Sequence, residues 1–109
     1  MPTGRLGTAN ITTTAATTAY TVPSATFSVV SVNIVNRSSS APVLIRLAVS
    51  GSATPGADEW IEFDSSLVAN GVLERTGIVM DTGKLLVVQT TTATPALSVV
   101  VYGIETSTA

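Results

Sequence analysis

The segment Thr26-Phe-Ser-Val-Val-Ser-Val-Asn-Ile-Val-Asn36 carries the strongest alternating pattern in this chain. Its side chains alternate between two faces, and Val30, Val32 and Ile34 share one of them. Valine and isoleucine fit the pleated, half-buried surface of a β-sheet. The pattern therefore predicts a long β-strand with three consecutive aliphatic side chains on one face. The other face mixes apolar and polar side chains: Phe27, Val29, Ser31, Asn33 and Val35.

A second strand follows a turn rich in serine. Over residues 43–50, Val43, Ile45, Leu47 and Val49 point one way and more polar residues point the other. This alternation predicts a strand with one face packed on a core and the other partly exposed to solvent. We expect it to lie beside the Thr26–Asn36 strand, antiparallel to it and in the same sheet.

Further strands recur about every ten residues, separated by turn residues, and no helical period of useful length is present. An Asn-Gly turn is expected at Asn70-Gly71. The whole chain is thus predicted to be all-β, an antiparallel two-sheet sandwich of about eight strands, jelly-roll-like. Residues 1–14 are interpreted as an extended N-terminal arm or edge strand, and residues 15–109 as a single β-sandwich domain. The remaining predicted strands cover residues 19–22, 58–64, 76–80, 84–90 and 96–105.

The composition excludes most enzyme chemistry. The 109 residues contain no histidine and no cysteine, and only 11% are charged. Imidazole and thiolate are the usual proton shuttle, nucleophile and transition-metal ligands. Lys84, the only lysine, stands beside a glycine in a turn. We therefore expect no enzyme, no catalytic residues, no cofactor and no metal.

The charges also bear on partners and location. Five cations are scattered singly, whereas nucleic-acid binding requires clustered ones, so no nucleic-acid partner is expected. No apolar run is long enough to span a membrane, and no secretory leader precedes the strands, so synthesis in a cytosol is expected.

One acidic segment holds the remaining candidates for chemistry. Asp58, Glu62 and Asp64 recur at two-residue steps, with Trp60 between them. Paired acids can hydrolyse glycosides or bind calcium, but such acids more often keep the wet face of a strand charged. Trp60 has two interpretations: a core or subunit-interface anchor, which we favour, and a sugar-stacking platform with Asp58 and Glu62.

Aliphatic side chains outnumber what a single core layer needs. Residues 85–88 and 99–104 are apolar on both faces, which indicates burial by other subunits. A surface with so little charge also favours contact with neighbours. The interface candidates are Arg5, Leu6, Trp60, Leu86, Val88, Val100 and Tyr102.

A resemblance to known proteins rests on the order of strands and on several turn phrases. The phrases are Thr18-Ala-Tyr-Thr-Val-Pro23, Asn33-Ile-Val-Asn-Arg-Ser-Ser39, Leu67-Val-Ala-Asn-Gly-Val-Leu73, Gly83-Lys-Leu85 and Val99-Val-Val-Tyr-Gly-Ile-Glu105. Over residues 4–105 the chain resembles small β-sandwich virion structural proteins of tailed bacteriophages, including those of cyanophages. The resemblance implies symmetric oligomers, often trimers, on a larger shell. It brings no catalytic motif.

The expected function is that of a capsid decoration (cement) protein, which would stabilise the head shell by contacting itself and the major capsid protein or other virion proteins. Its location would be the virion, after synthesis in the host cytoplasm. Two alternatives remain open: a tail or baseplate structural component, and a carbohydrate-binding module. The extended segment Thr3–Thr14 is the candidate arm, since its unpaired backbone could add a strand to a neighbour's sheet.

Overall fold

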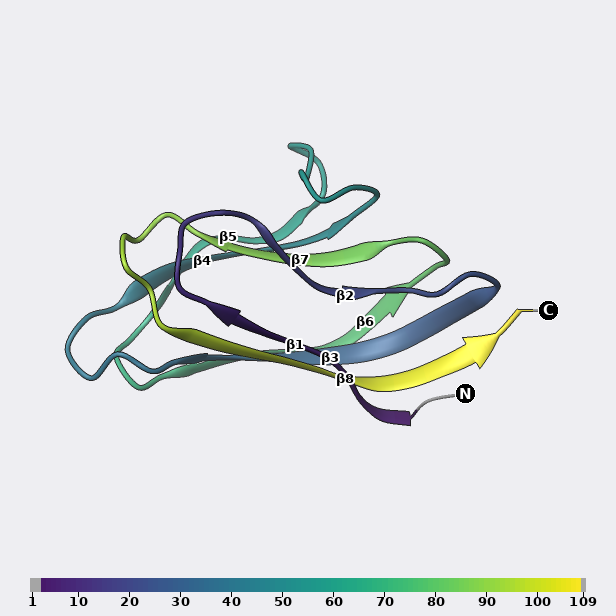
Figure 1. Ribbon diagram of the computed structural model, residues 1–109, viewed down its shortest axis with the longest axis horizontal. Helices are drawn as coiled ribbons and strands as arrows, with labels where there is room; N and C mark the ends of the chain where they lie inside the picture. Colours follow the sequence, from purple (N-terminus) through teal and green to yellow (C-terminus); the bar gives the residue numbers. More distant parts are fainter. Residues whose placement is uncertain (1–2, 109) are drawn as a thin grey trace.

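A computed structural model describes residues 3–108 (Figure 1). Within this range the regular structure consists of eight strands, without a helix, which confirms the all-β prediction. The strands are β1 (Thr3–Ile11), β2 (Thr17–Thr21), β3 (Thr26–Asn36), β4 (Val43–Ser50), β5 (Trp60–Leu67), β6 (Val72–Met80), β7 (Leu85–Thr90) and β8 (Leu97–Ser107).

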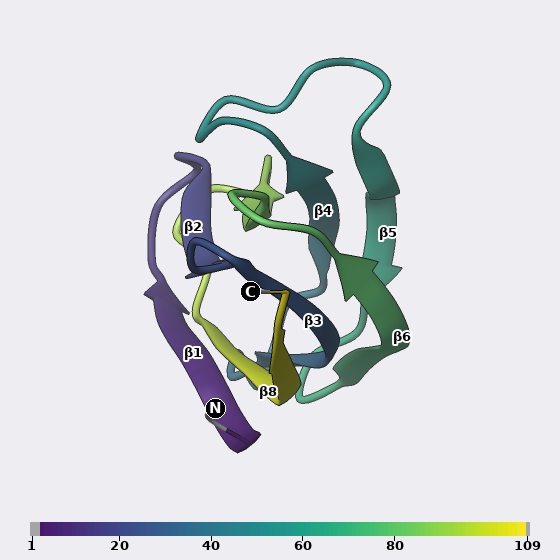
Figure 2. The same ribbon diagram turned by 90° about the vertical axis from the view of Figure 1, so that its right-hand side faces the viewer.

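The strands form two antiparallel sheets of four that pack face to face (Figure 2). Sheet A has the order β1-β8-β3-β6, and sheet B has the order β2-β7-β4-β5. From the ends of the chain toward its middle, β1 pairs with β8, β2 with β7, β3 with β6 and β4 with β5. The chain therefore behaves as one long hairpin whose paired halves wrap around a common core. This winding is the jelly roll, and the predicted fold class is confirmed.

The expected pairing of β3 with β4 is wrong. β3 lies in the middle of sheet A between β8 and β6, and β4 lies in sheet B between β7 and β5. Each strand has one mainly apolar face, and these two faces meet across the core instead of lying side by side. Ile34 from β3 and Ile45 and Leu47 from β4 are all fully buried there. A six-residue connection, residues 37–42, carries the chain from one sheet to the other.

Aliphatic side chains from all eight strands or their flanks fill the space between the sheets. Fully burying one such side chain stabilises the fold by about 1.5–3 kcal/mol. The largest completely buried side chains are Ile11, Ile34, Ile45, Leu47, Met80, Leu86 and Leu97.

The N-terminal segment is part of the sandwich. Residues Thr3–Ile11 form the edge strand β1 and pair along their length with β8, with a bulge at Leu6. Ile11 is 1% exposed and belongs to the core. At Gly7 the strand passes so close to β2 that an added Cβ would stand 2.2 Å from the carbonyl oxygen of Ala19. β1 is thus an edge strand of sheet A, and residues 1–2 of the predicted 1–14 segment lie outside the described residues.

Candidate binding surfaces

The outer face of sheet A carries a continuous group of exposed apolar side chains, here called the apolar patch: Phe27, Val29, Val79 and Ile104. Val29 on β3 is directly opposite Ile104 on β8 and directly opposite Val79 on β6. Side chains opposite one another in neighbouring strands lie about 4.5–5.5 Å apart at Cβ. Phe27 precedes Val29 by two residues and shares its face. The three strands therefore present one contiguous apolar surface.

The patch is well exposed. The exposed fractions are 38% for Phe27, 40% for Val29, 54% for Ile104 and 69% for Val79. The core does not require apolar residues at these positions, because the inward face of β3 is supplied by Val30 and its neighbours. Monomers rarely keep clustered large apolar side chains in water unless they serve as contact sites. The patch is the strongest candidate for a protein contact.

Polar side chains adjoin the patch on the same face. Tyr102 on β8 lies opposite Ser31 on β3, and its phenol donates a 2.6 Å hydrogen bond to Oε2 of Glu74 on β6. That hydrogen bond raises the pKa of the Tyr102 phenol, because it favours the protonated form. Arg5 on β1 lies opposite Tyr102 and is exposed. Three predicted interface residues, Arg5, Val100 and Tyr102, thus share the outer face that carries the patch.

The other predicted interface residues lie elsewhere. Leu86 and Val88 are fully buried within the core, so they cannot contact a second subunit from the outer face of β7. Both faces of β7 are apolar over residues 85–88, as predicted. The even-numbered residues face the core, however, so the residues that face outward are the odd-numbered ones. Leu85 is half-buried there, and Val87 is fully buried although it stands outside the core cluster. Leu6 lies at the bulge of β1, is partly buried and packs against the core.

Trp60 lies on the outer face of sheet B, opposite Ala48 of β4. Its indole meets the ring of Phe63 edge to face, with centroids 5.6 Å apart and planes at 67°. Together with Ala57 these two rings line a shallow, open pocket of about 330 Å³. Phe63 is 55% exposed. An aromatic pocket of this kind can receive a flat apolar surface.

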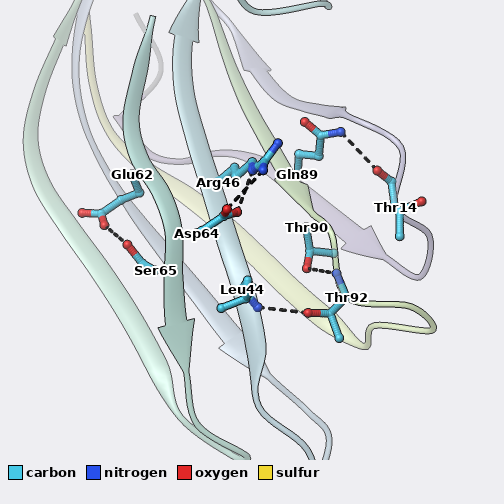
Figure 3. Close-up of polar contacts among 9 residues, drawn as sticks. All are labelled: Thr14, Leu44, Arg46, Glu62, Asp64, Ser65, Gln89, Thr90 and Thr92. Atoms are coloured by element: carbon cyan, nitrogen blue, oxygen red, sulfur yellow. Dashed lines mark hydrogen bonds and ion pairs between the residues drawn. The ribbon is translucent and has the colours of Figure 1, made fainter. Parts of the chain in front are cut away.

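A charged pair borders this pocket. The guanidinium carbon of Arg46 stands 4.0 Å from the centroid of Phe63. Its Nε donates to Oδ1 of Asp64 at 2.7 Å and its Nη2 donates to Oδ2 at 3.2 Å, as Figure 3 shows. This two-point contact lowers the pKa of Asp64, because it favours the carboxylate. Asp64 has a φ of 56°, which turns the strand out of the ideal pleat.

The expected row of acids on one face of β5 is wrong. The register of β5 with β4 shifts twice, so Trp60 pairs with Ala48 and Glu62 pairs with Leu47, which faces the core. Glu62 therefore points inward at the sheet edge, where it accepts hydrogen bonds from Ser65 and Arg75. These hydrogen bonds lower the pKa of Glu62. Asp58 precedes the strand in an exposed turn.

Glu59 supports the pocket from the loop between β4 and β5, which rises from the sandwich in Figure 1. Its Oε1 accepts hydrogen bonds from the backbone N–H of Gly56 at 2.7 Å and from Ser50 Oγ at 2.9 Å. Its Oε2 accepts one from the N–H of Gly51 at 3.1 Å. These donors lower the pKa of Glu59 and tie together the loop that carries Ala57.

Phe63 and Arg46, which complete the pocket around Trp60, were not predicted from the sequence. Period-two alternation placed Phe63 on the face opposite Trp60, and a bulge at Ile61 reverses that assignment. Arg46 offered a weak signal, because it is the one charged residue in a mainly apolar strand.

Within residues 3–108, no three acidic, histidine or cysteine side chains stand close enough together to hold a metal ion. The same residues contain no helix that could span a membrane. Lys84 pairs with Asp81 at 3.8 Å in the β6–β7 turn.

These features define an eight-stranded jelly-roll sandwich with an exposed apolar patch on one sheet and a small aromatic pocket on the other. No family model, curated protein or solved structure matches the chain.

Proposed function

We propose that this chain is a non-enzymatic virion structural protein, a capsid decoration protein that assembles into a symmetric homo-oligomer, a trimer, on the surface of a head shell. The apolar patch is the observation that supports this proposal most. The jelly-roll winding and the resemblance of the turn phrases to small phage structural proteins support it further.

In this proposal the patch forms the contact between subunits. Fully burying a valine, isoleucine or phenylalanine side chain contributes about 1.5–3 kcal/mol relative to full exposure. Each subunit offers four such side chains, all between 38% and 69% exposed. Association costs an estimated 4–15 kcal/mol of translational and rotational freedom. In a closed ring every subunit makes this contact, so each one gains the free energy of burying its patch. The ring also adds many weak contacts to the shell.

The low charge of the patch surroundings fits a contact with a like subunit. Across β3, the positions flanking Val29 on the outer face are Phe27 and Ser31, neither of which is charged. Two copies of such a surface can approach without like-charge repulsion. Arg5 and Glu74 lie farther along the same face, where they can set the orientation of the subunits.

The test compares two exposed valines. Val79→Asp places a charge in the patch, whereas Val68→Asp places the same charge in the β5–β6 connection, where Val68 is 65% exposed. Native mass spectrometry should find a trimer for the wild type and for Val68→Asp, and a monomer for Val79→Asp. Binding to purified head shells that lack decoration protein should follow the same order. A wild-type monomer that binds no shell would overturn the proposal, and binding to isolated tails alone would move the protein to the tail.

A further inference from the structure

We propose that the pocket formed by Ala57, Trp60 and Phe63 is a binding site for a neutral pyranose sugar. It lies on the outer face of sheet B, and the apolar patch lies on the outer face of sheet A. The proposal therefore does not rest on the decoration function, and the two can succeed or fail separately.

The floor of the pocket suits the apolar face of a sugar ring. A pyranose ring presents a patch of C–H groups that packs against an aromatic ring, which has a negative face. Phe63 is covered on one side by the Arg46 guanidinium, and 55% of the residue stays exposed. Trp60 meets it at 67°, so the two rings form a corner and not a flat surface. A volume of about 330 Å³ is at the low end for ligand pockets.

The rim offers hydrogen-bond donors and acceptors side by side. Arg46 uses Nε and Nη2 for Asp64, and within residues 3–108 its Nη1 has no hydrogen-bond partner. Each carboxylate oxygen of Asp64 accepts one hydrogen bond from Arg46 and keeps capacity for another. The Arg46 and Asp64 side chains are 23% and 36% exposed, so both can reach a ligand. Adjacent hydroxyl groups need this combination, because each hydroxyl both donates and accepts.

The charge of the rim argues for a neutral ligand. Arg46 and Asp64 neutralise one another, and the carboxylates of Asp58 and Glu59 follow Ala57 in the pocket loop, so the site disfavours an anionic sugar. A proline-rich peptide, the other common guest of aromatic surfaces, lies along an extended aromatic groove. Here the pocket is a single hollow lined by three residues. The observations therefore favour one sugar ring, or the end of a glycan, over an extended peptide.

The pocket is also held in shape before any ligand arrives. Glu59 ties the backbone N–H groups of Gly51 and Gly56 to the end of β4 through Ser50. Asp64 is held by Arg46 in a left-handed backbone conformation, which turns the strand beside Phe63. Preorganisation reduces the entropy lost on binding.

Trp60 makes the experiment direct, because it is the only tryptophan in the chain. Its fluorescence would be measured while glucose, galactose, mannose and N-acetylglucosamine are each added at millimolar concentrations. An array of neutral oligosaccharides built from these sugars would be screened in parallel. We expect saturable fluorescence changes with at least one sugar. Phe63→Ala should weaken that binding about tenfold, the scale of one lost aromatic contact.

Val68→Ala is the matched control, since it removes an exposed apolar side chain that belongs neither to the pocket nor to the apolar patch. It should bind the sugar as the wild type does. The thermal unfolding midpoint of each variant would show that both are folded. If no sugar changes the fluorescence or binds on the array, the proposal is wrong. It is also wrong if a proline-rich peptide library binds at Trp60 while the sugars do not, or if Phe63→Ala folds and binds with unchanged affinity.

Discussion

The phenol of Tyr20 on β2 donates a 2.6 Å hydrogen bond to Oε2 of Glu105 on β8, which joins sheet B to sheet A inside the sandwich. Ser28 Oγ lies 3.0 Å from the same phenol oxygen. Tyr20 and Glu105 are each 6% exposed, and Ser28 is fully buried. Burial, followed by the hydrogen bond to Glu105, raises the pKa of Tyr20 to about 12. This cluster is a polar link across an otherwise apolar core.

This link predicts a loss of stability in alkali. The ordinary tyrosine pKa is 10, so the folded state holds the Tyr20 proton more tightly than the unfolded state does. The contribution to the free energy of unfolding is complete below pH 10 and is lost as the pH rises from 10 to about 12. Urea unfolding between pH 8 and pH 12 measures it. Tyr20→Phe should lower the free energy of unfolding by about 1–3 kcal/mol at pH 8, because Glu105 loses its donor.

Tyr102→Phe is the control for this prediction. Tyr102 lies on the outer face of sheet A and does not contact the core link. Because the pKa of Tyr102 is raised as well, Tyr102→Phe should remove a smaller part of the alkaline loss, whereas the Tyr20→Phe substitution in the buried link should remove the larger part. Equal alkaline slopes for both variants would contradict the role given to Tyr20.

Replacing Asn36 is expected to lower the free energy of unfolding more than replacing Tyr20 does. The residue is fully buried, and its Nδ2 donates to the carbonyl oxygens of Ala41, Leu67 and Val68 at 2.9–3.3 Å. Asn36→Asp would replace this donor with an oxygen that faces three acceptors. We expect a loss of roughly 3 kcal/mol or more in the free energy of unfolding, from unpaired buried groups. Asn10→Ala, at an exposed site, should cost far less, and denaturant titration of the two variants compares them.

The contact between Glu62 and Arg75 predicts acid sensitivity. Hydrogen bonds from Ser65 and Arg75 lower the pKa of Glu62 in the folded state. Its contribution to stability is therefore present above the ordinary glutamate pKa, 4.5, and is lost as the pH falls through the lower folded value. Glu62→Gln should unfold with a shallower dependence on pH below 4.5 than the wild type. Identical acid profiles would show that this contact between β5 and β6 adds no stability.

The close approach of β1 to β2 predicts that Gly7 cannot be replaced. A Cβ at Gly7 would stand 2.2 Å from the carbonyl oxygen of Ala19, which is backbone and cannot move away alone. Gly7→Ala should therefore reduce the free energy of unfolding by about 1–3 kcal/mol, the usual cost of overpacking. Gly51→Ala, where an added Cβ meets no atom within 4 Å, is the matched control and should change thermal stability little.

The fold was largely predictable because apolar and polar side chains alternate clearly in the long central strand β3. The faces assigned to β3 are those observed: Val30, Val32 and Ile34 are buried, and Phe27 and Val29 are exposed. The turn at Asn70 was found as well, with a φ of 60° at that residue. Which strands pair was harder to predict, because an apolar face on β3 and another on β4 fit either one sheet or two facing sheets.

The aromatic pocket was only partly predictable for a different physical reason. Trp60 stood out by residue type, but its neighbours depend on the register shifts between β4 and β5. Each shift reverses which side chains face outward from that point on, and no residue type marks it. A single bulge thus separates Glu62 from Trp60 and brings Phe63 beside it.

The position of β8 in the middle of sheet A has a consequence for synthesis on the ribosome. β8 is the last strand in order, and it lies between β1 and β3, which are the first and third. Until residues 97–107 emerge from the exit tunnel, the backbone N–H and C=O groups of β1 and β3 that pair with β8 have no partner strand. Such topologies fold slowly, and their unpaired strand edges favour aggregation. Nascent chains are therefore expected to remain protease-sensitive until translation has passed β8.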